Sequence, residues 1–296
     1  HVLPAVPRIF EAVYDGVLKK MRKTGGIVEK MFNFFLNVAI IQKRMSRKMF
    51  KQDACFTSYK EPLWWILFFI PWVLLWPLYW LGNLLVFRKI KSMLGTEFRF
   101  GVSGGGAFPK RIDEFFWAIG VNIVEGYGLT ETSPVVSVRP IAAPIFRTIG
   151  SPLRGIQARI VDPQDGFVLE RCKEGVLQIK GETVMKGYYK NSEKTAAAFT
   201  VDGWLDTGDL AIFTIHDELQ IKGRIKDTIV LRGGENLEPV PIEGKLVESR
   251  YIKSAVVVGQ DKRYLAALIL VNEEEIKGYA DDNGIQYDTY ESMKMK

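Results

Sequence analysis

Residues 126–133 read Gly-Tyr-Gly-Leu-Thr-Glu-Thr-Ser, and this stretch decides how the rest of the sequence is interpreted. It combines flexible glycine backbone with an aromatic ring, hydroxyl groups and a carboxylate. A nucleotide site needs these groups: a ring that stacks on the base, donors for phosphate oxygens and a carboxylate that can hold Mg²⁺. The same stretch can also be a turn whose polar side chains have no binding role, so the surrounding sequence is needed to distinguish the two interpretations.

A glycine-rich loop, Ser103-Gly-Gly-Gly-Ala107, lies upstream. The segment from Glu97 to Val102 predicts a strand before this loop, and Val121 to Val124 predicts a second strand. Between them, apolar residues at helical spacing predict one buried helix face, at Ile112, Phe115, Phe116 and Ile119. Together these segments predict one α/β unit. Although tight turns need glycine too, backbone without side chains can approach a flat ring or an acyl chain, here at Gly104, Gly105 and Gly106.

The remaining sequence predicts helices before this unit and strands after it. Residues 8–22 and 27–50 have helical spacing. After about residue 156, the alternating segments ARIVD, VLQIKG and ELQIKG predict antiparallel strands separated by Asp-Gly turns. A compact α+β pattern follows Gly223, with a strand at 228–231, a helix at 240–250, strands at 254–259 and 264–271, and a helix from 273. We therefore expect one domain at 1–222 and a second at 223–296.

Several further motifs follow the two loops: Gly150-Ser-Pro-Leu153, Gly181-Glu-Thr-Val-Met-Lys-Gly-Tyr-Tyr-Lys190, Glu193-Lys-Thr195, Asp202-Gly-Trp-Leu-Asp-Thr-Gly-Asp209, Gly223-Arg-Ile-Lys-Asp227 and Gly233-Gly-Glu-Asn236. In this order they resemble the adenylate-forming (ANL) superfamily, specifically its long-chain acyl-CoA synthetases, the long-chain fatty acid–CoA ligases. The resemblance covers nearly all of residues 97–272. In addition, VPRIFEAVYDGV at 6–17 resembles a segment that these ligases carry downstream of their phosphate loop.

The resemblance implies an acyl-adenylate synthetase fold, which belongs to the α/β and α+β multidomain class. Residues 1–222 would form the C-terminal part of the large AMP-binding domain, built from α/β layers and a small β-barrel. Residues 223–296 would form an incomplete small α+β C-terminal domain.

The resemblance also implies roles for residues of the large domain. Tyr127 would stack on adenine, Thr130 would contact the α-phosphate and Glu131 would hold Mg²⁺. Asp209 resembles the carboxylate that accepts hydrogen bonds from both ribose hydroxyls, which suits a group with two oxygens. Glycine backbone of the same loop would approach the nucleotide, at Gly126 and Gly128.

In the small domain, Arg224 resembles a contact to the ribose and phosphate. Lys226 occupies the position of the hinge about which this domain rotates between the two half-reactions. The rotation would bring a loop towards the thioester-forming site, at Gly233, Gly234 and Glu235. Simpler interpretations exist for four of these residues. Arg224 could form a surface salt bridge, and Lys226 could be a solvated lysine. Asp209 and Thr132 could be cap or turn residues.

The implied reaction uses ATP, Mg²⁺ and coenzyme A. A fatty acid carboxylate attacks the α-phosphate of ATP to give acyl-AMP and pyrophosphate, and the thiol of coenzyme A then displaces AMP. Such catalysis depends on charge neutralisation and positioning. Neither His1, which is terminal, nor His216, in a predicted turn, is expected to act as a base. The family's phosphate loop would lie upstream of His1 and its adenylation lysine downstream of Lys296, so the 296-residue chain is expected to be inactive by itself.

An uncharged run, PLWWILFFIPWVLLWPLYWLGNLLVF at 62–87, stands out from an ordinary composition of 47% hydrophobic and 25% charged residues. As a straight helix it would extend roughly 39 Å, more than the ~30 Å hydrocarbon core of a bilayer. Pro71 and Pro77, with tryptophans spread along the run, favour a shallow or re-entrant helical hairpin. Basic flanks on both sides favour an anionic membrane surface and two cytoplasmic ends. We therefore expect peripheral or monotopic association through Leu63–Phe87, the alternative being a buried helix pair in a soluble core.

Composition and motifs leave few other classes of protein. Two cysteines, 27 glycines and 13 prolines exclude a disulfide-stapled miniprotein and a collagen-like repeat. The net charge of +6 is not accompanied by an RNA-binding pattern, so no nucleic acid partner is expected. Two rival functions are a noncatalytic membrane-surface module and a serine hydrolase, because Gly101-Val-Ser-Gly-Gly105 matches G-x-S-x-G. The hydrolase would use Ser103, Asp209 and His216, and it leaves the later motifs unexplained.

Overall fold

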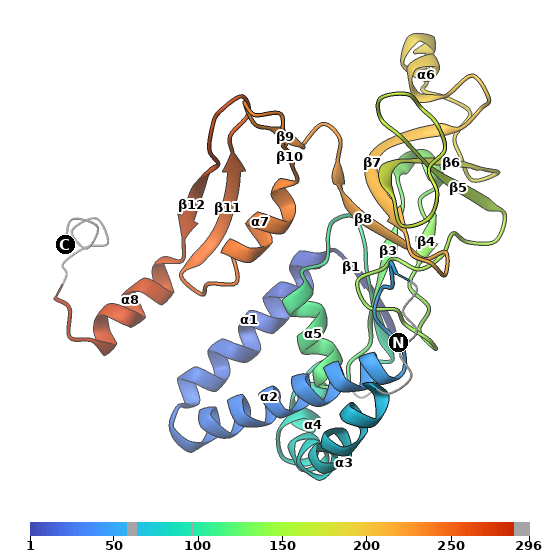
Figure 1. Cartoon of the computed structure of the whole chain (residues 1–296). Coiled ribbons are helices and arrows are strands. Elements are labelled where there is room, and N and C mark those ends of the chain that lie inside the picture. The colour runs from blue at the N-terminus through green and yellow to red at the C-terminus, as the bar shows by residue number, and fades with distance from the viewer. Residues whose placement is uncertain (58–63, 96, 287–296) are drawn as a thin grey trace. The chain divides into compact units, whose positions relative to one another are not determined.

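The computed structural model describes residues 1–57, 64–95 and 97–286 (Figure 1). The chain forms two compact units, His1–Ile221 and Lys222–Lys296. Pro62 and Leu63, which begin the predicted apolar insert, lie outside the described residues.

The first unit contains a four-stranded sheet in the order β1-β2-β3-β4. Its strands are β1 (Val2–Ala5), β2 (Phe100–Ser103), β3 (Ile123–Tyr127) and β4 (Ser137–Val138). β1, β2 and β3 run parallel, and β4 pairs antiparallel with β3. Because β2 and β3 are parallel neighbours, the loops that leave their carboxyl ends lie at the same edge of the sheet. The glycine loop and the 126–133 stretch are these two loops.

Most helical side chains of the core beside this sheet come from α1 (Pro7–Thr24), α2 (Gly26–Met49) and α5 (Lys110–Ala118) (Figure 1), and Phe87 and Ile90 add to it. The core is rich in phenylalanine, and edge-to-face contacts join Phe10 to Phe116 at 6.0 Å and Tyr14 to Phe115 at 4.9 Å between ring centroids. The helical spacing at 8–22, 27–50 and 112–119 therefore identified these helices correctly.

The apolar run forms one continuous helix, because α3 (Trp64–Gly82), the π-helical turn η1 (Asn83–Phe87) and α4 (Arg88–Met93) follow one another without a break. The predicted helical hairpin is therefore wrong for the described part of the run. Pro71 and Pro77 lie inside α3. Each proline removes one backbone donor, and the remaining hydrogen bonds carry the helix through both positions.

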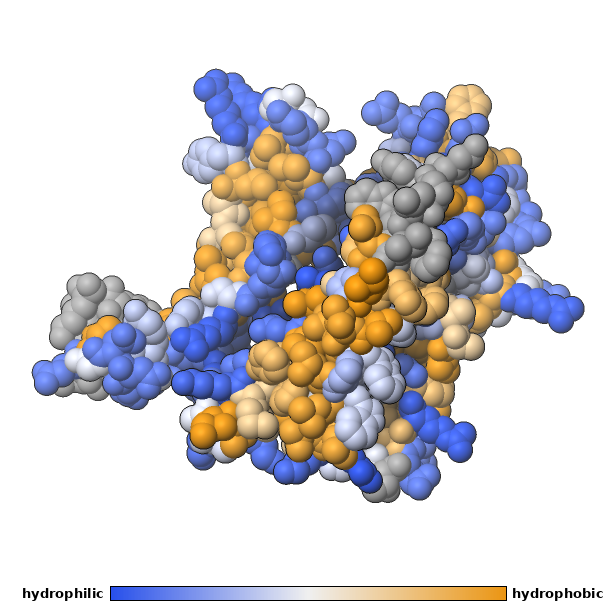
Figure 2. Space-filling model, turned by 60° about the horizontal axis from the view of Figure 1, so that its bottom comes forward, coloured by the Kyte–Doolittle hydropathy of each residue, from blue (hydrophilic) through white to orange (hydrophobic). Residues whose placement is uncertain are grey.

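This helix is exposed. Among the described residues, Leu67–Met93 is the one helix long and apolar enough to cross a membrane by length and composition, and 6% of its apolar window is buried. Figure 2, which brings the underside of Figure 1 forward, shows apolar side chains gathered on one face of the molecule. The alternative of a helix pair buried in a soluble core is therefore not observed.

A second sheet follows in the order β5-β6-β7-β8, with strands β5 (Ile156–Val161), β6 (Glu174–Gly181), β7 (Leu205–Phe213) and β8 (Leu219–Arg224). The short helix α6 (Ser192–Ala198) lies between β6 and β7 in sequence. The predicted antiparallel strands are present, but in the described chain they form an open sheet instead of the predicted β-barrel. Closure would require pairing between β5 and β8, and four strands are too few for a barrel with a packed interior.

The described part of the second unit contains two antiparallel strand pairs and two helices. β9 (Ile229–Val230) pairs with β10 (Asn236–Leu237), and β11 (Ile252–Val258) pairs with β12 (Ala266–Val271). The helices are α7 (Pro239–Leu246) and α8 (Glu273–Asp282). The predicted α+β order of elements is observed, with α7 shorter than the expected 240–250 helix.

Candidate functional site

The loop after β3 is a tight turn that only glycine can begin. A Cβ on Gly128 would overlap the backbone carbonyl of Pro134. The chain then enters the short 3-10 turn η2 (Thr130–Thr132). The buried Thr132 hydroxyl accepts from Leu129 N at 2.9 Å and lies 3.0 Å from the Leu129 carbonyl, so Thr132 caps the turn. Thr130 is exposed at the start of this turn.

Tyr127 and Asp209 are brought together although they are 82 residues apart in the chain. Tyr127 ends β3 in the first sheet, and Asp209 lies in β7 of the second sheet. The Tyr127 hydroxyl donates to Asp209 Oδ2 at 2.5 Å, and Asp209 is 3% exposed. The structure thus joins the ring predicted to stack on a base to the carboxylate predicted to bind a ribose.

Glu131 is held by the segment that precedes α6. The Tyr188 hydroxyl donates a hydrogen bond to Glu131 Oε1 at 2.8 Å, and Met185 N donates one to the Glu131 backbone carbonyl at 2.7 Å. The hydrogen bond to Glu131 raises the pKa of the Tyr188 hydroxyl. The motif at 181–190 contains Tyr188, but no role was predicted for this residue from the sequence. Its place within a recognised motif is the signal that could have indicated a role.

The glycine loop lies beside the same turn. A Cβ on Gly104 would lie 3.4 Å from the Gly126 carbonyl, and Gly104 N donates to the Ala5 carbonyl at 3.2 Å. Gly105 and Gly106 are exposed, and Gly105 has a φ of +78°, which favours glycine. The two loops predicted to approach the nucleotide are therefore adjacent in the first unit.

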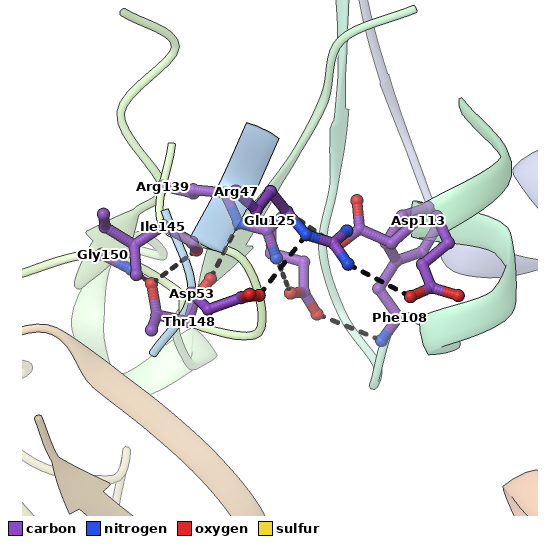
Figure 3. A network of polar contacts seen from close by, with 10 residues as sticks. Arg47, Asp53, Phe108, Asp113, Glu125, Arg139, Ile145, Thr148 and Gly150 are labelled. Atoms are coloured by element: carbon purple, nitrogen blue, oxygen red, sulfur yellow. Dashed lines mark hydrogen bonds and ion pairs between the residues drawn. The ribbon is translucent and has the colours of Figure 1, made fainter. Parts of the chain in front are cut away.

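A buried ionic network connects β3 with the end of the glycine loop (Figure 3). The fully buried Arg139 side chain donates to Asp113 at 2.8 Å, to Glu125 at 2.5 Å and to the Thr148 carbonyl at 2.9 Å. Glu125 also accepts from Phe108 N at 3.3 Å, at the end of the glycine loop. One guanidinium thus ties β3, the glycine loop and α5 together.

A second arginine extends the network. Arg47 of α2 lies 3.4 Å from Asp53 and 3.2 Å from Glu114, and its guanidinium stacks 3.8 Å from the centroid of Phe146. Neither these two arginines nor their carboxylate partners were predicted from the sequence. A carboxylate within the apolar strand Ile123-Val-Glu125 is the signal that could have indicated a buried charge.

Two carboxylates share the charge of Arg139, and burial decides their protonation. Burial raises the pKa of Glu125 to about 7; Arg139 offsets part of this effect and Asp113 adds to it. Burial also raises the pKa of Asp113. Since one guanidinium neutralises one carboxylate, the second is more stable with its proton retained.

The remaining predicted residues belong to the second unit. Lys226 is exposed in a turn in which Asp227 N and Thr228 N donate to the Arg224 carbonyl at 2.9 and 3.2 Å. Arg224 itself is exposed at the end of β8. The turn between β9 and β10 holds the three predicted loop residues, with Gly234 at a φ of +90°: Gly233, Gly234 and Glu235.

The described residues do not form the rival serine hydrolase site. Ser103 is 1% exposed, and its hydroxyl has no hydrogen-bond partner among the described residues. Asp209 is bonded to Tyr127, and His216 is exposed in the turn between β7 and β8. These contacts do not form a catalytic triad with Ser103 as nucleophile, His216 as base and Asp209 as acid.

The described residues contain no group of three or more histidine, cysteine and acidic side chains that could hold a metal. A Mg²⁺ ion bound with a nucleotide does not require such a group, because it is commonly held by one or two carboxylates together with substrate phosphates and water. Glu131, half-buried beside the exposed Thr130, is a suitable single carboxylate.

Comparisons with known proteins identify the family. Residues 1–189 match the model for the AMP-binding enzyme family, and residues 226–289 match its AMP-binding enzyme C-terminal domain. The chain belongs to the AMP-binding enzyme family, which confirms the resemblance to adenylate-forming enzymes. The corresponding fold class is confirmed too, apart from the barrel.

Individual relatives agree with this result. The chain is 37% identical over 292 residues to the Arabidopsis thaliana chloroplastic long-chain-fatty-acid–[acyl-carrier-protein] ligase AEE15, covering 93% of this chain and 40% of the relative. It is 37% identical over 199 residues to the long-chain-fatty-acid–CoA ligase FadD15 of Mycobacterium tuberculosis, covering 67% and 31%. The ATP-bound MatB structure from Rhodopseudomonas palustris is 30% identical, with a TM-score of 0.52 over 59% of this chain and 35% of that one. The chain spans about two fifths of the length of the first curated relatives it matches.

The protonation of Glu125 predicts an unusual pH dependence of stability. Its folded-state pKa of about 7 lies above the ordinary value of 4.5, so the unfolded chain releases this proton first as the pH rises. Glu125 therefore lowers the free energy of unfolding between about pH 4.5 and 7, by up to about 3 kcal/mol. The variant Glu125→Gln should lose this decline in urea unfolding measured from about pH 5 to 8.

Glu114→Gln is the matched control for this measurement. Burial acts to raise the pKa of Glu114, but hydrogen bonds and charge from Arg44 and Arg47 lower it overall. Its stabilising effect is lost only as the pH falls below the ordinary value of 4.5, so this variant should keep the decline. An unchanged pH slope in Glu125→Gln would contradict the proposed protonation.

Proposed function

We propose that the full-length protein is an ATP-dependent ligase that activates a long-chain fatty acid as acyl-AMP and transfers it to coenzyme A. The observation that carries this proposal is the hydrogen bond between Tyr127 and Asp209, which joins a base-stacking ring to a ribose-binding carboxylate. The family match and the long-chain relatives support the substrate class. We also assign residues 1–222 to the AMP-binding domain and 223–296 to the small domain.

The first half-reaction forms the acyl-adenylate. The fatty acid carboxylate attacks the α-phosphorus of ATP, and the bond to the bridging oxygen breaks, so that pyrophosphate leaves. Tyr127 stacks on adenine, Asp209 accepts hydrogen bonds from the ribose hydroxyls, and Thr130 donates to the α-phosphate. Glycine backbone lets the loops approach the nucleotide, at Gly104, Gly105, Gly106, Gly126 and Gly128. Mg²⁺, held by Glu131 and the phosphates, would neutralise charge on the leaving pyrophosphate.

The second half-reaction transfers the acyl group. The thiol of coenzyme A attacks the acyl carbon, its proton is lost to solvent, and AMP leaves with the bonding electrons. We propose that the second unit serves this step through its exposed turns. Lys226 is the hinge residue and Arg224 contacts the ribose and phosphate, while the β9–β10 turn approaches the thiol through Gly233, Gly234 and Glu235.

A second acceptor is supported by one relative. The name of the 37% identical Arabidopsis ligase gives acyl-carrier protein as its acceptor. Both acceptors present a thiol, so the proposed adenylation site serves either. Single-turnover transfer from preformed acyl-AMP to coenzyme A or to acyl-carrier protein distinguishes them.

The adenylation proposal predicts the effect of Asp209→Asn in the full-length protein. Replacing one carboxylate oxygen by an amide removes an acceptor for a ribose hydroxyl, so kcat/KM for ATP should fall roughly 10–100-fold. Fatty acid-dependent ATP–pyrophosphate exchange measures this value. Asp217→Asn is the matched control, because Asp217 is an exposed turn residue bonded to Arg171 at 2.7 Å. If the wild-type protein shows no exchange, the noncatalytic membrane-module alternative is favoured instead.

We further propose that the exposed helix docks on a membrane as a monotopic anchor, with both ends on the cytoplasmic side. Its apolar side chains are largely uncovered, including Leu67, Ile70 and Leu74 at 60–69% exposure. These three lie at i, i+3 and i+7, which places them on one helix face. Burying this face in the interface of a bilayer would bring the ligase to the compartment that holds its substrate.

Docking predicts a selective effect of polar substitutions. Changing Leu67, Ile70 and Leu74 to Gln together should abolish flotation of the full-length protein with phosphatidylcholine vesicles, because the apolar contact area is lost. The control changes three exposed apolar residues in connecting segments of the first unit to Gln, namely Phe167, Val168 and Val201. Undiminished flotation of the helix variant would contradict docking through α3.

A further inference from the structure

A polar cluster lies against the apolar helix and contains two lysines. We call it the amine site; it consists of Lys43 on α2, Tyr79 on α3, Asn83 on η1 and Lys91 on α4. Lys91 Nζ donates to Asn83 Oδ1 at 2.6 Å, and Lys43 Nζ lies 5.1 Å from the centroid of the Tyr79 ring. All four residues are half-buried.

Gly120, in the turn after α5, lies next to the amine site. A Cβ on Gly120 would lie 3.5 Å from Tyr79 Oη and 3.7 Å from Lys91 Nζ. Because residue 120 is glycine, no side chain of this turn covers the Tyr79 hydroxyl or the Lys91 amine. In addition, η1 is a π-helical turn, a distortion that is frequent at functional sites. It places Asn83 where its carbonyl oxygen meets Lys91, which leaves the amide nitrogen as a donor.

The two amines have no acidic partner among the described residues. The arginines that flank Lys43 on α2 are different: Arg44 pairs with Glu114 at 2.7 Å, and Arg47 pairs with Glu114 and Asp53. Burial lowers the pKa of Lys43, and the charge of Lys91 lowers it further. Two partly desolvated amines that repel each other are unfavourable, and a bound anion would offset this cost.

The donors define the chemistry of that anion. Two ammonium groups, a phenol and an amide nitrogen offer more donors than the two oxygens of a carboxylate can use, whereas a phosphate group has additional oxygens. Tyr79, Asn83 and Lys91 lie on the same continuous helix as the exposed apolar side chains, and Lys43 reaches Tyr79 from α2, so an anion bound there is close to the proposed bilayer surface. An amphiphile with a phosphate head fits both features.

We infer that Lys43, Tyr79, Asn83 and Lys91 form a binding site for the phosphate group of an anionic membrane lipid. This inference rests on the proposed docking of the helix on a membrane. The site would add recognition of the head group to an otherwise nonspecific apolar contact.

The test compares two double variants of the full-length protein. Lys43→Gln with Lys91→Gln removes both amines of the site. Lys48→Gln with Lys89→Gln removes two exposed lysines from the same helices, α2 and α4, and is the matched control. Binding is measured by flotation with phosphatidylcholine vesicles, with and without phosphatidylglycerol, at low salt and at about 1 M salt, where charges are screened beyond about 3 Å.

The expected result separates a site from general attraction. At low salt, both variants should lose affinity for phosphatidylglycerol vesicles, by roughly fivefold for each lysine removed. At high salt the control variant and the wild-type protein should bind these vesicles with about the same affinity, because exposed charges are screened. The amine-site variant should still bind about 10-fold more weakly than the wild-type protein does at the same salt concentration. Equal affinities of the two variants at high salt would overturn the inference.

Two further measurements identify the source of any failure. If wild-type protein does not bind pure phosphatidylcholine vesicles, the docking proposal fails. Ligand binding at the amine site is then measured separately, as protection of Lys43 and Lys91 from acetylation, by mass spectrometry of the modified peptides. Protection by phosphatidylglycerol, absent with inorganic phosphate at equal concentration, supports the lipid site. Protection by inorganic phosphate alone, or by neither, overturns it.

Discussion

The fully buried Arg139 is the residue on which the arrangement of the candidate site depends. It binds Glu125 on β3, Asp113 on α5 and the carbonyl of Thr148, and Glu125 in turn accepts from the end of the glycine loop. A buried charge that loses its partners is strongly destabilising. The segments that carry the two loops are therefore held in one relative position, independently of any bound nucleotide. Such preorganisation suits a reaction that depends on positioning more than on proton transfer.

Local sequence patterns predicted most of the helices and strands, whereas contacts between segments distant in the sequence could not be predicted. The helices at 8–22 and 27–50 and the strands after residue 156 follow from periodicity that each segment carries by itself. Tyr127 and Asp209 were each identified from motifs, but no local signal indicates that a hydrogen bond joins them. The barrel was wrong because pairing between sheet edges is a property of the whole sheet. The hairpin was wrong because the effect of Pro71 and Pro77 was overestimated.

Buried charges were the largest omission of the sequence interpretation. Arg139 follows Val138 and precedes Pro140, and nothing in that context distinguishes it from a surface arginine. Likewise, Lys43, Lys48, Lys89 and Lys91 all lie in the basic flanks of the apolar run, but Lys43 and Lys91 are half-buried whereas Lys48 and Lys89 are exposed. Exposure is decided by tertiary packing, so residues of one type with similar neighbours in sequence acquire different roles. The apolar helix and the two loops at 103–107 and 126–133 belong to the same unit.

The central claim, that Arg139 holds both loops in place, is tested most directly by hydrogen exchange of the full-length protein carrying Arg139→Lys. Lysine keeps the positive charge but cannot reproduce the forked contacts of the guanidinium. Faster exchange confined to the amides of 104–108 and 125–132, with the β5–β8 sheet unchanged, is the result that this account predicts. Unaltered protection in both loops, or a uniform loss throughout the first unit, would contradict it.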